Sequence, residues 1–278
     1  MRATLAAFAL SFLISACGGG GAGQSPAALP ALAAAPANSG NAAAAGASPA
    51  ATSSQAPPNV PAGMHSINFA GYTWVVKDSG TGLDGPGPNT WSSDASTVFV
   101  DGNGYLHLKV WQDAGVWKCA EVYLLQTLGY GAYRFTLGTD VSRLDPNLVL
   151  GLFTYSNAAA QNHRELDIEF SRWGLANGTL NADYTVQAAT TPGNADFWTE
   201  GAGLGDTEHS LQWLAGQANF SSAVPGYAPY SAFSVANASV PSSLDEVVHI
   251  NLWLSQGNAP LNGQPLEVVI KGFSFTPG

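Results

Sequence analysis

Residues 165–170 read Glu-Leu-Asp-Ile-Glu-Phe, so acidic and apolar residues alternate with a period of two. Side chains of a β-strand point to opposite faces of a sheet with this same period. Glu165, Asp167 and Glu169 are therefore predicted to share one face of a strand, while the apolar residues between them face a hydrophobic core. Only 10% of the chain is charged, so three like charges on one face indicate that this face has a use.

The sequence beyond about residue 63 has the pattern of a larger β-structure. Short runs rich in β-branched and aromatic residues are separated by Gly, Asn, Asp and Pro, and no helical period persists. This pattern favours an all-β domain of two packed antiparallel sheets, in which residues 189–205 form a loop. We expect strands at 72–76, 97–100, 105–111, 120–125, 131–137, 148–155, 165–171, 183–188, 208–213, 249–254 and 266–276.

Two short segments predict how these strands are arranged. Residues 101–104 read Asp-Gly-Asn-Gly, which is typical of a hairpin turn. Residues 148–153 are apolar at nearly every position, which predicts a central strand that is covered on both faces. The loop at 157–162 then connects this strand to the acidic strand as a hairpin.

The beginning of the chain predicts export. Residues 1–16 carry one basic residue before an apolar stretch that is too short to cross a bilayer, as in a signal peptide. Residues 14–17, Ile-Ser-Ala-Cys, resemble the lipobox of bacterial lipoproteins, in which the Cys is lipidated and begins the mature protein. We expect Cys17 to carry a lipid such as palmitate. The alternative is an ordinary signal peptide followed by an unmodified cysteine.

The next segment is predicted to separate a lipid anchor from a folded domain. Residues 17–62 contain no charged side chain and consist mainly of Gly, Ala, Pro and Ser, a composition typical of a disordered linker. Residues 63–278 then form one domain. The protein is predicted to be exported and anchored by its lipid to a bacterial membrane, with the domain facing the periplasm or the exterior.

Charge and cysteine content narrow the range of partners. A formal net charge of −10 argues against nucleic acid and anionic membrane surfaces as partners. If Cys17 is lipidated, Cys119 has no disulfide partner and is expected to be a small buried residue; a nucleophilic role is the alternative. We expect a monomer with no cofactor and no metal ion.

Three passages together resemble glycoside hydrolase family 16, whose members cleave β-linked polysaccharides. Residues 165–169 match the catalytic signature Glu-x-Asp-x-Glu of that family. Residues 120–121 with 129–135, and residues 251–253, resemble strands that accompany the signature. The resemblance implies a β-jelly-roll sandwich of two antiparallel sheets with a concave ligand-binding cleft.

The resemblance also implies the roles of the three acids. Glu165 is the expected nucleophile, Glu169 the general acid and base, and Asp167 the carboxylate that tunes both. Retention requires two carboxyl groups about 5 to 5.5 Å apart, whereas a strand separates the Cα atoms of residues 165 and 169 by about 13 Å. The acidic face is therefore expected to be concave. A structural row of acids or a calcium site is the alternative.

Aromatic and polar side chains are expected to hold the sugar, because sugar rings stack on aromatic faces. The resemblance selects Trp253. Trp173 shares the parity of the acidic face and is either a cleft wall or a loop anchor, and Tyr130 is either a weaker candidate or part of the core. Glu121 is expected either to bond a sugar hydroxyl or to lie at the surface. His163 is expected either to contact substrate or to be a polar loop residue.

These observations predict a retaining, endo-acting glycoside hydrolase whose substrate is a β-linked polysaccharide similar to a β-glucan. Two alternatives remain open. A lectin-like domain would bind glycan on the same scaffold without cutting it. A transglycosylase would transfer the covalent intermediate to a sugar acceptor instead of to water.

Overall fold

The computed structural model describes residues 60–61 and 64–278. The predicted signal peptide, Cys17 and nearly all of the predicted linker lie outside these residues, so the lipid anchor, the linker and the localisation stay predictions. Within the described residues, no helix has both the length and the apolar character required to cross a membrane.

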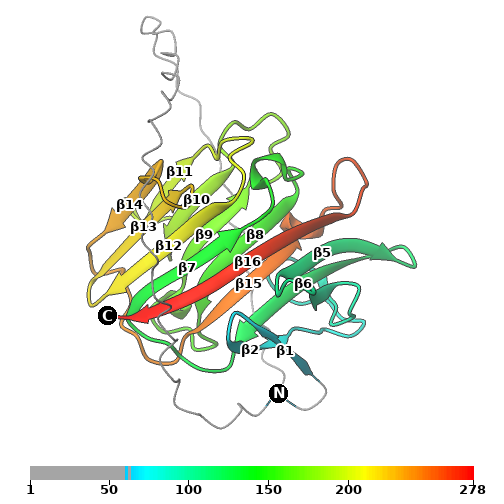
Figure 1. Ribbon diagram of the computed structural model, residues 1–278, viewed down its shortest axis with the longest axis horizontal. Helices are drawn as coiled ribbons and strands as arrows, with labels where there is room; N and C mark the ends of the chain where they lie inside the picture. Colours follow the sequence, from blue (N-terminus) through cyan, green and yellow to red (C-terminus); the bar gives the residue numbers. More distant parts are fainter. Residues whose placement is uncertain (1–59, 62–63) are drawn as a thin grey trace, which may run out of the picture. The chain divides into compact units, whose positions relative to one another are not determined.

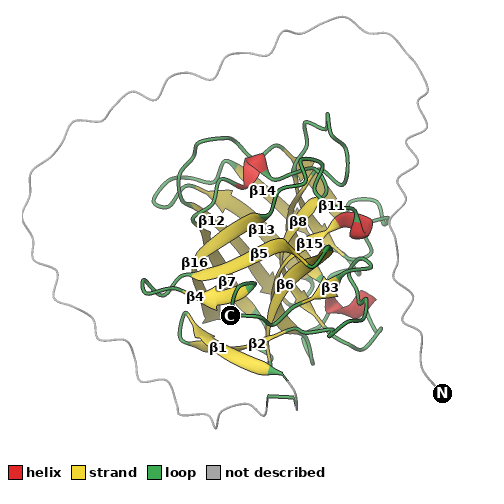
Figure 2. Cartoon of the chain, turned by 90° about the vertical axis from the view of Figure 1, so that its right-hand side faces the viewer, coloured by secondary structure: helices red, strands yellow, loops and turns green. Residues whose placement is uncertain are grey.

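The described residues form an antiparallel β-structure that folds into two layers (Figures 1 and 2). The layer that carries the acidic strand is called the acidic sheet. Its strands, in spatial order, are β11 (Ala195–Trp198), β10 (Ala182–Val186), β9 (Leu166–Ser171), β8 (Leu148–Tyr155), β15 (Val247–Leu254), β6 (Val116–Leu124), β2 (Tyr72–Val76) and β1 (His65–Phe69).

The second layer is called the opposite sheet. Its strands, in spatial order, are β14 (Ser231–Val235), β13 (Gln217–Ala223), β12 (Thr207–Leu214), β7 (Gly131–Leu137), β16 (Leu266–Pro277), β5 (Leu106–Asp113) and β4 (Val98–Val100). A hairpin of β5 and β6 joins the two sheets, and the short strand β3 (Thr90–Trp91) pairs in parallel with β6. Short 3₁₀ helices occupy loops at η1 (Val141–Arg143), η2 (Asn162–Arg164) and η3 (Ser255–Gly257). The predicted two-sheet fold is confirmed.

All eleven predicted strands are present, three of them with the predicted bounds: β2, β7 and β8. The hairpin at 101–104 connects β4 to β5, and β8 is a central strand between β15 and β9, as predicted. Residues 189–205 are not wholly a loop, because they contain β11. Strands β1, β3, β13 and β14 were also not predicted from the sequence. Strand β13 contains no β-branched residue, so its sequence carries little strand signal.

The hydrophobic core lies between the two sheets, where their apolar faces meet. Aromatic contacts cross this interface: Phe170 of β9 lies edge-on to His209 of β12 at 4.7 Å, and Tyr184 of β10 stacks on Phe220 of β13 at 5.4 Å. The His209 ring contacts the hydroxyls of Ser222 and Thr207, and burial lowers the pKa of His209 to about 3. His209 is therefore neutral and forms part of the support beneath the acidic strand.

Candidate active site

The acidic strand has the two faces that the sequence predicts. Leu166, Ile168 and Phe170 are at most 1% exposed and belong to the core. Glu165 lies directly before β9 with an extended backbone and so continues the alternation. Asp167 is buried, whereas Glu165 and Glu169 are half-buried. The two glutamates that the resemblance assigns to bond cleavage are thus more exposed residues than the aspartate between them.

Strand register places a fourth carboxylate next to Glu169. Asp183 of β10 lies directly opposite Glu169, and Thr185 lies opposite Asp167. On the other side of β9, Gly151 of β8 lies opposite Glu169. Directly opposed residues of neighbouring strands point to the same face. Asp183 therefore extends the acidic row of β9 onto the neighbouring strand.

Hydrogen bonds divide the four acids into two classes. Asp167 accepts a hydrogen bond from Gln187 Nε2 at 2.9 Å. Asp183 accepts one from Thr185 Oγ1 at 2.9 Å and one from Trp173 Nε1 at 3.3 Å. The carboxyl groups of Glu165 and Glu169 have no hydrogen-bond partner within the described residues. The aspartates are held in place by the protein, and the glutamates remain available to a ligand.

Burial raises the pKa of every carboxyl group in this cluster. Burial raises the pKa of Glu165 to about 7, and it raises the pKa of Asp183 to about 7 although two hydrogen bonds act in the other direction. The pKa values of Asp167 and Glu169 are raised well above their usual range by burial and by the neighbouring carboxylates. Near neutral pH the cluster therefore contains both ionised and protonated carboxyl groups.

A strained turn sets the position of Glu165. The four residues before it, Gln161 to Arg164, have φ angles between 50° and 61°, a conformation that non-glycine residues rarely adopt in succession. Arg164 holds this turn through an ion pair of 3.1 Å with Asp245 and a hydrogen bond from Nε to the carbonyl of Ser242. The hydroxyl of Thr154 also donates to the carbonyl of Arg164. These contacts fix the backbone that enters β9.

The same turn brings His163 next to the acidic face. Its ring stacks on Tyr155 with a centroid separation of 4.9 Å and an interplanar angle of 6°. Its Nδ1 lies 2.9 Å from the carbonyl oxygen of Ser156. Tyr155 follows the residue of β8 that pairs with Leu166, so it lies beside Glu165. His163 and Tyr155 therefore form a flat aromatic surface beside the first glutamate.

Two tryptophans lie at the other end of the acidic strand. Trp253 of β15 lies edge-on to Trp173 at 6.1 Å, and Trp173 also donates to Asp183. Trp173 is 37% exposed, so it is both a loop anchor and a solvent-facing surface, whereas Trp253 is 9% exposed and packs with the core. Tyr130, by contrast, packs on Trp213 of the opposite sheet at 5.1 Å and accepts a hydrogen bond from Ser243 N. The structure therefore places Tyr130 with the core and not with the acids.

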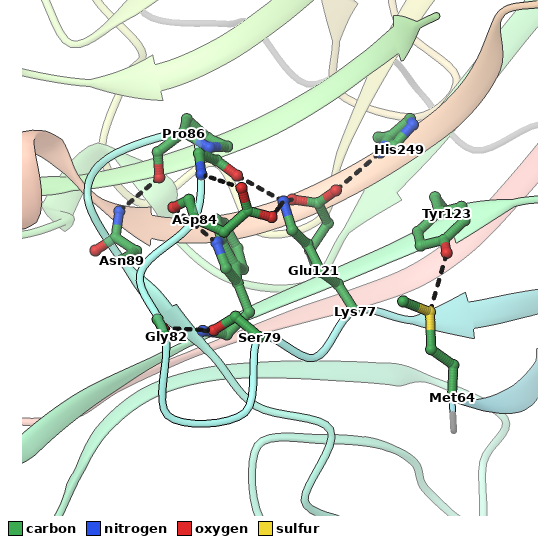
Figure 3. A network of polar contacts seen from close by, with 12 residues as sticks. Met64, Lys77, Ser79, Gly82, Asp84, Pro86, Asn89, Glu121, Tyr123 and His249 are labelled. Carbon is green, nitrogen blue, oxygen red and sulfur yellow. Dashed lines mark hydrogen bonds and ion pairs between the residues drawn. The ribbon is translucent and has the colours of Figure 1, made fainter. Parts of the chain in front are cut away.

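Glu121 takes part in a polar network on the same sheet (Figure 3). Lys77 and His249 approach its carboxylate, with Lys77 Nζ 3.4 Å from Oε2 and His249 Nδ1 2.9 Å from Oε1. Burial disfavours the charge of Glu121, but these two partners outweigh burial and hold its pKa below the usual range. Glu121 lies opposite Asn251 of β15, and Asn251 lies opposite Gly151. Glu121 is thus a fixed carboxylate at the far end of the Glu169 row, and not a surface residue.

Cys119 is fully buried, as predicted, and burial raises the pKa of its thiol to about 12. A thiol in that state is a poor nucleophile. Within the described residues, no three His, Cys, Asp or Glu side chains are grouped so that they would hold a metal ion.

Comparison with known proteins identifies the fold. No protein-family model and no curated protein matches the sequence. A β-1,3-glucanase from Mycobacterium marinum matches with a TM-score of 0.55 and 19% identity, over 73% of this chain and 90% of its own. The β-glucanase of Bacillus licheniformis matches with a TM-score of 0.51 and 19% identity, over 80% and 96%. This chain has the β-glucanase fold.

The glucanase fold confirms the β-jelly-roll that the resemblance to family 16 implies. A third match is described as an immunostimulatory antigen and pseudo β-1,3-glucanase of Mycobacterium tuberculosis, with a TM-score of 0.55 and 18% identity, over 74% of this chain and 91% of its own. One fold can thus carry different functions, so activity has to be argued from the carboxyl groups themselves.

The sequence analysis did not predict four residues that lie in or directly beside strands of the acidic sheet: Asp183, Lys77, His249 and Tyr155. Asp183 had a detectable signal. It begins the predicted strand at 183–188, in which polar residues recur at every second position as they do in the acidic strand. The other three become neighbours of the site only through strand pairing, which the sequence alone does not fix.

The network around Glu121 predicts a loss of stability in Lys77→Met. Glu121 is 3% exposed, so removing the ammonium group leaves a buried carboxylate with the His249 ring as its remaining side-chain partner. We expect a loss of about 2 kcal/mol in the free energy of unfolding, less than for a fully buried pair because the Lys77 side chain is 17% exposed. Urea unfolding at pH 7 measures this value. In the Glu121→Gln background the same change should cost much less; an equal cost in both backgrounds would contradict the coupling.

Proposed function

We propose that this chain is a retaining, endo-acting glycoside hydrolase that cleaves a β-linked polysaccharide. One observation carries the proposal: Glu165 and Glu169, which have no hydrogen-bond partner within the described residues, lie on one face of a strand on either side of the anchored Asp167. A structural row of acids has no need to leave its two accessible members without donors. The β-glucanase fold of the solved relatives supports the same reaction class.

In the proposed reaction, the ionised carboxylate of Glu165 attacks the anomeric carbon of the sugar. Glu169 gives its proton to the glycosidic oxygen as the bond from that oxygen to the anomeric carbon breaks. Water then attacks the covalent intermediate, Glu169 takes a proton from this water, and Glu165 leaves as a carboxylate. The raised pKa of Glu169 favours the protonated form that a general acid requires, and Glu165, with a pKa of about 7, is partly ionised near neutral pH.

The proposed polysaccharide lies across the outer face of the acidic sheet, in the cleft that the sequence predicts. The ring of His163 on Tyr155 offers one stacking surface beside Glu165, and Trp173, which lies edge-on to the buried Trp253, offers a second near Asp183. Aromatic surfaces at both ends of the acidic strand suit a chain of several sugar units and therefore internal cleavage.

The test is release of new reducing ends from a panel of β-glucans and algal galactans. We expect activity on at least one β-1,3 or mixed-linkage glucan, with oligosaccharides as early products because cleavage is internal. Addition of a sugar acceptor distinguishes hydrolysis from chain transfer. Binding of a glycan with no product after prolonged incubation would contradict the proposal and support a lectin-like role.

We also propose that Cys17 carries a lipid that anchors the exported protein to a bacterial membrane. The resemblance of residues 14–17 to a lipobox supports this anchor. We expect the intact chain to sediment with membranes when it is expressed in a bacterium, and Cys17→Ser to remain in the soluble fraction. Radiolabelled palmitate should enter the intact chain only. Equal labelling of both proteins would contradict the assignment of Cys17.

A further inference from the structure

Asp183 is the one acid of the cluster that lies on another strand. It pairs with Glu169 in the register of β9 and β10, and it is 2% exposed. Directly opposed side chains on one face have Cβ atoms about 4.5 to 5.5 Å apart. At that separation two carboxylates strongly disfavour a second negative charge.

The hydrogen bonds show which member of this pair holds the charge. Both oxygens of Asp183 accept a bond, one from Trp173 Nε1 and the other from Thr185 Oγ1. These donors stabilise the ionised form of Asp183. Glu169 accepts no hydrogen bond from any described residue, so no donor of the protein stabilises its ionised form.

We propose that Asp183 is a positioning residue for the proposed reaction: when Asp183 is ionised, its negative charge keeps the proton on Glu169 until that proton passes to the glycosidic oxygen. The catalytic role of Asp183 rests on the proposed function. The coupling between the two carboxyl groups is a property of the structure that can be measured without turnover.

Other charged groups near Glu169 either act in the same direction or are engaged elsewhere. Strand β8 presents Gly151 opposite Glu169, and β15 presents the neutral Asn251 one strand further. Lys77 and His249, which lie on this face of the sheet, contact the carboxylate of Glu121. The groups on this face that carry a negative charge or a titratable proton are Glu165 and Asp167 on the same chain segment, Asp183 on β10, Tyr155 on β8 and Glu121 on β6. His163, which stacks on Tyr155, adds a titratable ring beside Glu165.

Asp183→Asn removes the charge and preserves the shape of the side chain. The alkaline limb of kcat/KM, where Glu169 loses its proton, should move to lower pH by at least about one unit. The resonance of the Glu169 carboxyl carbon, assigned through Glu169→Gln in the full-length labelled chain, should show the same shift in its titration. Asp196→Asn is the matched control, because Asp196 pairs with Tyr184 and so lies on the other face of the sheet. In this control variant, the pKa of the Glu169 carboxyl group should remain within about 0.3 unit of the wild-type value.

Thr185→Val provides a second variant in case Asp183→Asn does not fold. It removes one donor to Asp183 at nearly constant volume, so Asp183 ionises less readily and the alkaline limb moves in the same direction by a smaller amount. An unchanged limb and an unchanged carbon titration in these variants would overturn the role of Asp183. A wild type with no activity would contradict the proposed function alone. The carbon titration would then decide the coupling, with a shift supporting it and no shift overturning it.

Discussion

Glu165→Gln is expected to lower kcat/KM for reducing-sugar release by at least about 10³-fold, because an amide cannot attack the anomeric carbon. The substitution keeps the shape of the side chain and removes one charge from the carboxylate cluster. The backbone at this position is set by the strained turn of residues 161–164, which Arg164, Ser242 and Asp245 hold without the Glu165 side chain. The fold should therefore remain intact. Initial rates on the most active glucan of the panel measure the effect.

Glu267→Gln is the matched control for this loss. Glu267 pairs with Lys109 across β16 and β5, on the opposite sheet. We expect that variant to retain the rate of the wild type within about twofold, as surface charges contribute little. Glu165→Gln with near-normal activity and normal binding would remove Glu165 from the nucleophile role.

The stability of the protein is expected to fall by at least about 3 kcal/mol between pH 6.5 and pH 8. A group whose pKa is higher in the folded state binds more protons there than in the unfolded chain, so stability decreases as pH rises through this interval. Asp167 and Glu169 have pKa values well above the ordinary range. Each lowers the free energy of unfolding by about 1.4 kcal/mol per pH unit over the range in which it is protonated in the folded state and ionised in the unfolded chain. Glu165, Asp183 and Glu200, with pKa values of about 7, add to the loss at the start of the interval.

Chemical denaturation at several pH values measures this loss. The interval begins at pH 6.5 because the buried His209 has a lowered pKa, and below that pH it gives stability a dependence of the opposite sign. Glu169→Gln should flatten the pH dependence, since an amide has no proton to lose. The double variant with Asp167→Asn should flatten it further. A wild type of constant or rising stability over this interval would contradict the raised pKa values.

The acidic strand shows how much a sequence can predict. Its period of two was sufficient to place Glu165, Asp167 and Glu169 on one face and Leu166, Ile168 and Phe170 in the core. Local chemistry also predicted the hairpin at 101–104, because Gly and Asn readily adopt the backbone angles of a tight turn. Features that depend on neighbours within a few residues were therefore accessible from the sequence.

Features that depend on pairing between distant segments were not accessible. Asp183 lies opposite Glu169 because of the register of β10 on β9, and Lys77 reaches Glu121 across the pairing of β2 with β6. Strand β13 is held mainly by backbone pairing with β12 and β14, so its small polar residues gave no strand signal. Tyr130 was separated from the acids by packing on Trp213, a contact that its own sequence neighbourhood does not encode.

The anomeric configuration of the first product tests the central claim most directly. If Glu165 attacks the anomeric carbon and water then displaces it, two inversions return the sugar to its original configuration. Proton magnetic resonance during early glucan cleavage should therefore show the β-anomer before mutarotation produces the α-anomer. Initial appearance of the α-anomer would mean a single displacement by water, and it would contradict the assignment of Glu165 as nucleophile and Glu169 as its acid and base.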